Sequence, residues 1–300
     1  MRNCLSRFLS IVAFAALAGA GPLAHTVQAQ VLVPHQVELD RTNLERQGMI
    51  LAREAIQLAQ FRQTEEALAR ARLAVRLAPR AYETWAVLGS LYLRNQDFSK
   101  AISNLQEASR RAPNNPDLLS SLGSAYLQQG NHAQAVQSLQ NALKLAGGNS
   151  AGTRFDLGNA YFQLRRFREA IDQYSRALAL EGKFWPAMNN IGLVEYESGN
   201  ARSAIRRWEA ALAIDSEAAE PKLALAVALY KLGQRERGLS LGEAALRLDP
   251  RYASPDFLRE NLWGERLLTD ARSVLSNPRI QSTLRDARPS SPPTPEASGN

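Results

Sequence analysis

The sequence predicts an all-α solenoid of about six helix–turn–helix units with a C-terminal capping helix. One observation is an internal repeat: the stretch from Tyr82 to Asn115 returns as a close copy directly after it, over 116–150. Within it, counting Tyr82 as position 1, large apolar residues occupy positions 4, 7 and 11, which is the spacing of one helical face. Helices of about 14 residues are marginal alone in water, so such units must stack to be stable.

Three positions of each unit carry only glycine or alanine. Position 8 reads Ala55, Gly89, Gly123, Gly158, Gly192 and Ala226; position 20 reads Ala67, Ala101, Ala135, Ala170, Ala204 and Gly238; position 27 reads Ala74, Ala108, Ala142, Ala177, Ala211 and Ala245. The spacing between successive units is constant except for an insertion near Gly147-Gly148. Glycine inside a helix costs about 1 kcal/mol relative to alanine. We therefore expect close packing at position 8, with the alanine of position 20 lying against it.

This pattern resembles the tetratricopeptide repeat, a helix–turn–helix unit of about 34 residues. Polar turns such as Asn95-Gln96-Asp97 separate the two helices of a unit. The resemblance covers residues 48 to 251 and implies a right-handed α-solenoid. The predicted repeat region is 44–251, with units in register at 48–81, 82–115, 116–150, 151–184, 185–218 and 219–252.

Residues 1–29 have the pattern of a secretory signal peptide. Arg2 and Arg7 precede a short apolar run at 8–18, and small residues at Val27 and Ala29 suit cleavage before Gln30. The alternative is an uncleaved N-terminal anchor, although a spanning helix needs about 20 apolar residues. We expect export, to the periplasm or, in a cyanobacterium, to the thylakoid lumen or membrane. No spanning helix is expected after cleavage.

Composition argues against catalysis, cofactors and nucleic acid. The net charge of +7 falls to +5 without Arg2 and Arg7, from 34 basic and 29 acidic residues, and the charges are scattered over helix faces. The only cysteine, Cys4, lies in the predicted leader, and His35 and His132 lack metal-ligand spacing. We expect no enzyme activity, no cofactor, no metal site and no nucleic-acid partner.

The flanks of the repeat region have their own predictions. Residues 30–43 are expected to be a linker, residues 252–288 a capping helix with a short extension, and residues 289–300 a disordered tail rich in proline and serine. The helix should run from Asp256 to Leu275 with a bend near Gly264, over the exposed end of the sixth unit. We expect Trp263 to fill a notch left by Gly238 and Gly242.

The resemblance implies a concave groove lined by positions 2, 5, 9, 12 and 13 of each first helix. Aromatic rings and asparagines at these positions suit an extended or helical peptide, because asparagine can pair with backbone amides. The alternative is that some rings pack between units. The predicted groove residues are Arg94, Phe155, Asn159, Phe162, Gln163, Asn189, Tyr196 and Tyr230.

The expected function is that of a non-catalytic scaffold that binds a protein or peptide and mediates assembly or regulation of a protein complex. That complex could be associated with a membrane. Two alternatives stay open. One is a self-associating structural component of cell-envelope machinery. The other is a photosystem assembly factor, since small tetratricopeptide proteins include such factors.

Overall fold

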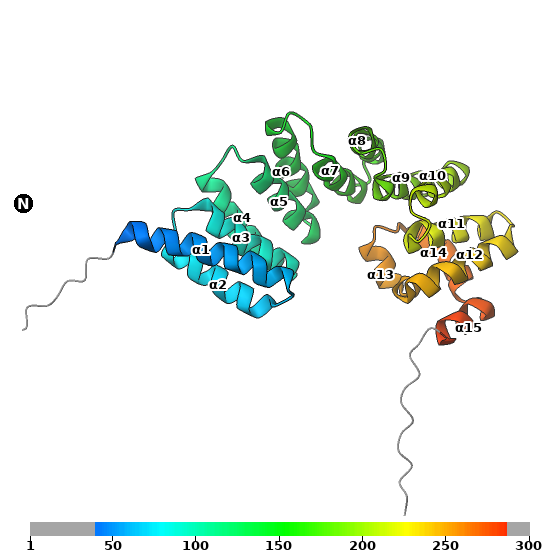
Figure 1. Ribbon diagram of the computed structural model, residues 1–300. Coiled ribbons are helices and arrows are strands. Elements are labelled where there is room, and N and C mark those ends of the chain that lie inside the picture. Colours follow the sequence, from blue (N-terminus) through cyan, green and yellow to red (C-terminus); the bar gives the residue numbers. More distant parts are fainter. Residues whose placement is uncertain (1–39, 287–300) are drawn as a thin grey trace, which may run out of the picture. The chain divides into compact units, whose positions relative to one another are not determined.

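A computed structural model of the protein describes residues 40–286, and within that range it is helical with no strand (Figure 1). The elements are α1 (Arg41–Gln60), α2 (Thr64–Leu77), α3 (Tyr82–Arg94), α4 (Phe98–Arg111), α5 (Pro116–Gln128), α6 (His132–Leu145), α7 (Ala151–Gln163), α8 (Phe167–Leu180), α9 (Trp185–Glu197), α10 (Ala201–Ile214), α11 (Ala219–Lys231), α12 (Arg235–Leu248), the 3₁₀-helix η1 (Pro250–Ala253), α13 (Pro255–Glu260), α14 (Glu265–Leu275) and α15 (Pro278–Asp286). The predicted all-α fold is confirmed. The predicted signal peptide, most of the linker and the predicted tail lie outside the described residues.

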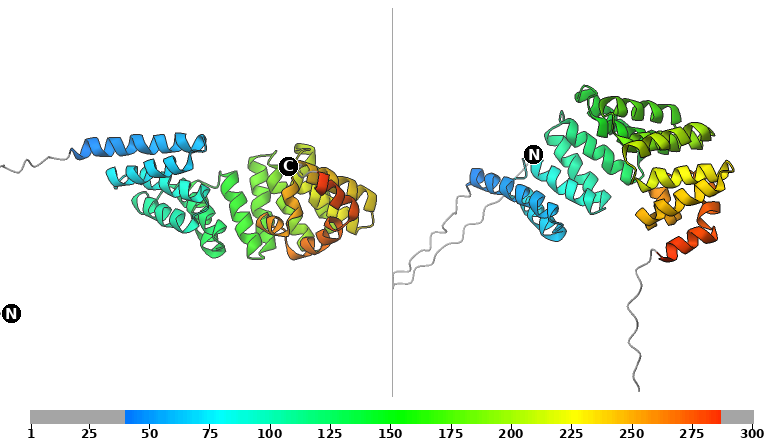
Figure 2. Two further views of the ribbon diagram at one scale, coloured as in Figure 1. Left: turned by 90° about the horizontal axis from the view of Figure 1, so that it is seen from below. Right: turned by 45° about the vertical axis from the view of Figure 1, so that its right-hand side comes forward.

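The helices pair as the repeat requires. Each odd-numbered helix from α1 to α11 packs against the even-numbered helix that follows it, and each second helix packs on the first helix of the next unit (Figure 2). The first helices also contact one another in order, from α1 and α3 through α9 and α11. This continuous chain of contacts is that of a solenoid.

Side-chain capping marks the start of several helices. The side chain of Asp40 accepts a hydrogen bond from the backbone N–H of Asn43, so α1 begins at Arg41, inside the stretch expected to be a linker. Asp97, Asn115 and Ser150 cap later helices in the same way. The helix-to-helix turns then place position 15 of every unit in the left-handed region, at Arg62, Gln96, Gly130, Arg165, Gly199 and Gly233.

The small residues of positions 8, 20 and 27 are buried in all six units. The expected partner of position 8 was wrong, however. A Cβ built on Gly123 would lie 2.5 Å from Cγ of Leu139, and one on Gly192 would lie 2.5 Å from Nε1 of Trp208. Both neighbours occupy position 24, not position 20. The glycine makes room for the large side chain at position 24 of the second helix.

The two end units show the converse. They carry alanine at position 8, and position 24 is then small: Ala55 goes with Ala71, and Ala226 with Gly242. The four middle units pair glycine at position 8 with leucine, leucine, tyrosine or tryptophan at position 24. The spacing of the two helices leaves room for only one large side chain where they cross, so positions 8 and 24 share a limited volume.

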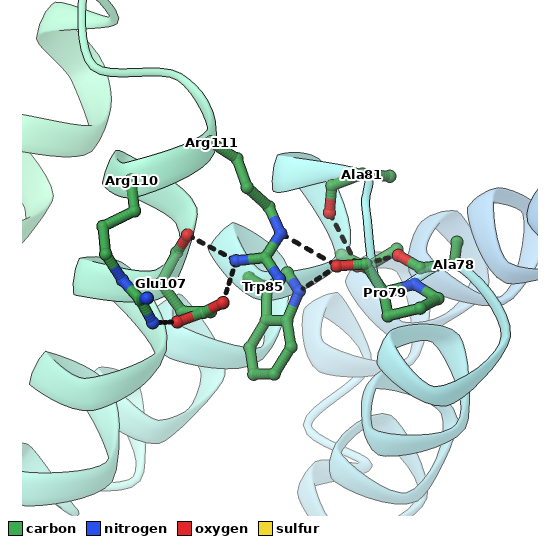
Figure 3. Close-up of polar contacts among 8 residues, drawn as sticks. Ala78, Pro79, Ala81, Trp85, Glu107, Arg110 and Arg111 are labelled. Atoms are coloured by element: carbon green, nitrogen blue, oxygen red, sulfur yellow. Dashed lines mark hydrogen bonds and ion pairs between the residues drawn. The ribbon is translucent and has the colours of Figure 1, made fainter. Parts of the chain in front are cut away.

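The junction between the first two units is tied by polar contacts around one carbonyl (Figure 3). The indole Nε1 of Trp85 and the guanidinium Nε of Arg111 donate to the carbonyl of Pro79 at 2.9 and 2.8 Å. The guanidinium of Arg111 also lies over the Trp85 ring, 4.9 Å from its centroid, and Glu107 pairs with both Arg110 and Arg111. The α2–α3 loop is thereby joined to the end of α4.

The C-terminal segment, residues 255–286, differs from the expectation. It forms three helices, and the break falls at Gly264, which caps α14. The Trp263 hypothesis was wrong: the atoms nearest to a Cβ on Gly242 belong to Ile280, Val274 and Ala226. Trp263 is 3% exposed but lies elsewhere, with its Nε1 donating to Glu220 at 3.2 Å. Gly238 packs against the backbone of its own partner helix, α11.

Candidate functional site

The groove face, meaning positions 2, 5, 9, 12 and 13 of the first helices, contains a pocket of about 440 Å³. Helices α5, α7 and α9 contribute most of its wall, and α13 of the C-terminal segment closes it. The lining residues are Leu127, Gln128, Gly130, His132, Phe155, Asn159, Gln163, Trp185, Pro186, Asn190, Glu220, Arg259, Glu260, Asn261 and Leu262. We call this space the carboxamide pocket, because five of its side chains are asparagine or glutamine.

Asn159 is held at the wall of this pocket by its oxygen. The hydroxyl of Tyr174 and the Nδ2 of Asn190 both donate to Oδ1 of Asn159, at 2.7 and 2.9 Å. Asn190 in turn accepts from Nδ2 of Asn189 at 3.1 Å. The Nδ2 of Asn159 and the amides of Gln128 and Gln163 have no hydrogen-bond partner within residues 40–286. These amides are therefore available to pair with a ligand.

The apolar part of the wall is aromatic. The ring of Phe155 lies 5.7 Å from that of Tyr174 and 5.2 Å from that of Phe184, and Phe155 keeps partial exposure toward the pocket. Trp185 lines the same space from the start of α9. Rings with nearby carboxamides can take both the side chains and the backbone of a peptide.

Burial shifts the pKa values of Glu220 and His132 toward their neutral forms. Burial raises the pKa of the Glu220 carboxyl to about 7, and it lowers the pKa of His132. On the neighbouring interface of α5 and α7, burial raises the pKa of Asp156, against the opposing hydrogen bond from Ser124. The lining therefore offers mainly hydrogen-bonding and apolar groups, together with the charged residues Arg259 and Glu260.

A second pocket, also of about 440 Å³, lies beside the first. Phe162, Phe167 and Trp263 provide its apolar side, and Arg165, Glu197 and Glu265 are among its charged residues. The two pockets share Gln163, Arg259 and Leu262. The turn between α13 and α14, which contains Leu262, thus lies between them.

The predicted groove residues fall into three groups. Gln163 and Arg94 are exposed, and Arg94 donates to the carbonyl of Ala59 at 3.1 Å. Phe155, Asn159 and Tyr230 are partly buried. Phe162, Asn189 and Tyr196 are buried, at 8%, 1% and 2% exposure, as the packing alternative anticipates for the rings. The structure brings Phe155, Asn159 and Gln163 together in the carboxamide pocket.

The expected groove positions missed the contribution of α13 and of four residues in the repeats, Gly130, His132, Trp185 and Asn190. Arg259, Asn261 and Leu262 lie beyond the last repeat, so no repeat position indicated that they reach the groove face. Trp185 and His132 sit at the first position of a helix, outside the positions expected to line the groove. Only their proximity to α7 in space identifies them.

The range of residues 40–286 contains no group of three or more His, Cys, Asp or Glu side chains placed to hold a metal ion. None of its helices combines the length and the apolar character needed to cross a membrane.

The helix pairs and their groove face define a helical-repeat interaction protein. Two tetratricopeptide repeat models match, one at residues 86–150 and 189–253 and the other at residues 126–190, together spanning 86–253. The chain belongs to the tetratricopeptide repeat family. A model of ChAPs, the Chs5p-Arf1p-binding proteins, matches residues 22–110. No curated protein sequence matches the chain.

Solved structures share the fold. PilW, a type IV pilus biogenesis factor, is 19% identical with a TM-score of 0.62, covering 74% of this chain and 97% of that chain. PilF of Pseudomonas aeruginosa is 18% identical with a TM-score of 0.60, covering 74% and 98%. A chain of the APC/C hetero-tetramer Cut9–Hcn1 is 17% identical with a TM-score of 0.62, and the match covers 79% of this chain and 45% of that chain. These likenesses support the α-solenoid fold. The tetratricopeptide repeat family, to which the chain belongs, is generally one of non-catalytic protein-interaction modules.

Proposed function

We propose that the protein binds an extended peptide segment of a partner protein in the carboxamide pocket, and thereby mediates assembly or regulation of a protein complex without catalysis. The observation that carries this proposal is the convergence of free amides from Gln128, Asn159 and Gln163 beside the Phe155 ring. Side-chain amides can pair with both the N–H and the C=O of a peptide backbone.

The test is capture of a partner by the full chain, compared with a Gln128→Ala/Gln163→Ala variant. Both glutamines are exposed and outside the core, so melting should be unchanged. Losing two hydrogen bonds of about 1 kcal/mol each should weaken binding on the order of tenfold or more. A Gln134→Ala/Gln137→Ala variant on the exposed face of α6 is the matched control. The proposal fails if all three proteins retain the same partners.

Self-association is a second candidate, and the first unit provides the observation that favours it. Phe61 is 78% exposed and Ile56 is 45% exposed, large apolar surfaces that often mark interfaces. Sedimentation should then show concentration-dependent oligomers that Phe61→Ser removes. A monomer at all concentrations excludes this role.

Photosystem assembly is a narrower form of the first proposal. The identity of the captured partner would show whether the protein has this role.

Export is proposed from the sequence alone, since residues 1–29 lie outside the described residues. Cell fractionation with N-terminal sequencing would test it. A mature N-terminus at Gln30 in a periplasmic or lumenal fraction is the expected result. An intact leader in the membrane fraction would indicate the uncleaved anchor instead.

A further inference from the structure

The C-terminal segment does not continue the repeat. In a repeating solenoid, a new first helix packs mainly on the second helix before it, as α7 packs on α6. Here α14 packs mainly on the first helices α11 and α9 and contacts α12 only slightly, while α15 covers α12 (Figure 1). Helix α14 therefore lies on the groove face of the fifth and sixth units.

Four groove side chains hold this segment by complementary polar contacts. The Glu197 carboxylate accepts from the backbone N–H groups of Arg266 and Leu267, at 3.2 and 2.9 Å, and so caps the start of α14. Tyr196 and Lys231 both reach Asp270, at 2.8 and 2.7 Å. Glu220 accepts from the Trp263 indole at 3.2 Å.

All four side chains occupy groove positions of their units: Tyr196 is at position 12, Glu197 and Lys231 are at position 13, and Glu220 is at position 2. The apolar face of α14 adds Leu267, Leu268, Ala271 and Val274, all buried and spaced along one side of the helix. At the cap, Gly264 approaches Glu197 so closely that a Cβ there would clash with the carboxylate. The segment is thus bound as an amphipathic helical ligand would be bound.

The connection between α13 and α14 is short and bordered by open space, and it is anchored in the core by Leu258 and Trp263. Leu262 has φ of 65°, a left-handed conformation that costs about 1–2 kcal/mol for a residue with a side chain. The turn containing it has a pocket on each side. In the six-residue helix α13, only Leu258 is buried. Local opening of this turn would release α14 from the groove face.

We infer that the groove face of α9 and α11 is a helix-binding site, masked in this state by the chain's own α14, and that its external ligand is an amphipathic helix. The ligand's chemistry follows from the bound segment: an indole followed by glycine at the N-cap, apolar residues on one face, and a carboxylate in the second turn that pairs with Tyr196 and Lys231. Such a helix competes with the C-terminal segment. This site adjoins the carboxamide pocket: the two share Glu220, and α13 of the same segment forms part of the pocket wall. The inference rests on the contacts of α14 and does not depend on the peptide-binding proposal.

The test uses the full chain and a labelled synthetic peptide of residues 255–286 as the probe. Trp263→Ala/Asp270→Ala weakens the segment but leaves the groove unchanged, and this variant should bind the peptide about tenfold more tightly than the wild type, because a larger fraction of its sites is open. Adding Glu197→Ala should remove that binding. Thr269→Ala/Arg272→Ala, on the exposed face of α14, is the matched control and should behave as wild type.

Failure of the weakened chain to bind the peptide, with the helicity of the repeats intact, would overturn the inference. Hydrogen exchange of the wild type tests it independently, even if the variant misfolds. Amides of α14 should exchange about tenfold faster than those of α9 and α11 through local opening, and equal protection would show a fixed part of the fold. A wild-type dimer that dissociates in the weakened variant would assign the site to a second copy instead, and would also overturn the inference.

Discussion

Positions 8 and 24 share one packing volume, and a double-mutant cycle at Gly123 and Leu139 measures that dependence. A Cβ on residue 123 would lie 2.5 Å from Cγ and 2.7 Å from Cδ2 of Leu139, whose side chain is 0% exposed and therefore cannot move aside into solvent. Overpacking of this kind costs about 1–3 kcal/mol, so Gly123→Ala alone should destabilise by that amount. Leu139→Ala alone should cost about 2–5 kcal/mol through the cavity it leaves.

The double variant should lose less than the sum of these values. It recreates the pair Ala55 and Ala71 of the first unit, both of which are fully buried. The new methyl at residue 123 meets no clash once Leu139 is truncated, and it fills part of the cavity. We expect a coupling free energy of about 1 kcal/mol or more in favour of the double variant.

The assay is urea denaturation followed by circular dichroism, with hydrogen exchange of α5 and α6 as a local measurement. The local measurement is needed because solenoid units can unfold separately, and a single transition then does not report one free energy. Additivity within about 0.5 kcal/mol would refute the reasoning, since it would mean that the two positions do not share a volume.

Three further predictions follow from single residues. The first concerns Glu220, whose pKa of about 7 means that the folded state binds its proton more tightly than the unfolded state does. The free energy of unfolding should therefore fall by up to about 3 kcal/mol as pH rises from 4.5 to 7. Denaturation at several pH values should show that Glu220→Gln removes this pH dependence, and identical pH profiles for the variant and the wild type would contradict the prediction. The second concerns backbone conformation: Gly130→Ala should destabilise the fold by about 1 kcal/mol, because φ there is 85° although the space around it is open. Gly152→Ala lies in equally open space but inside a helix, so it should be neutral or stabilising by up to about 1 kcal/mol. Equal effects of the two substitutions on the urea midpoint would refute the backbone argument. Trp263→Ala should lower the melting temperature of the C-terminal helices through loss of a buried indole, and an unchanged melting profile would show that the indole contributes no packing.

The sequence was sufficient for the fold because the repeat tests the same pattern six times. Each unit requires small residues where its helices cross, and this requirement is local, so it is visible in the chain at positions such as Ala101 and Ala108. The identity of the neighbour at the crossing was not visible. Helix rotation decides whether position 20 or position 24 faces the glycine, and only the packed pair showed that Leu139 does so.

The groove was predictable in part. Register placed Phe155, Asn159 and Gln163 on one face, and the structure gathers them in one pocket. Register did not reveal that Tyr196 is covered, because its covering residue, Asp270, is 74 residues away and outside the repeat. The repeat describes only contacts between neighbouring units, so any contact made by the segment after residue 252 is independent of it.

The sequence by itself therefore determined the α-solenoid and its set of candidate groove residues, since both follow from short-range periodicity. Tertiary structure alone decided which part of the groove face is open. The C-terminal segment could have continued the stack or left it. Instead, the indole of Trp263 bonds to Glu220, the start of α14 is capped by Glu197, and Asp270 pairs with Lys231. These long-range contacts cover the first helices of the last two units and leave the carboxamide pocket as the accessible site.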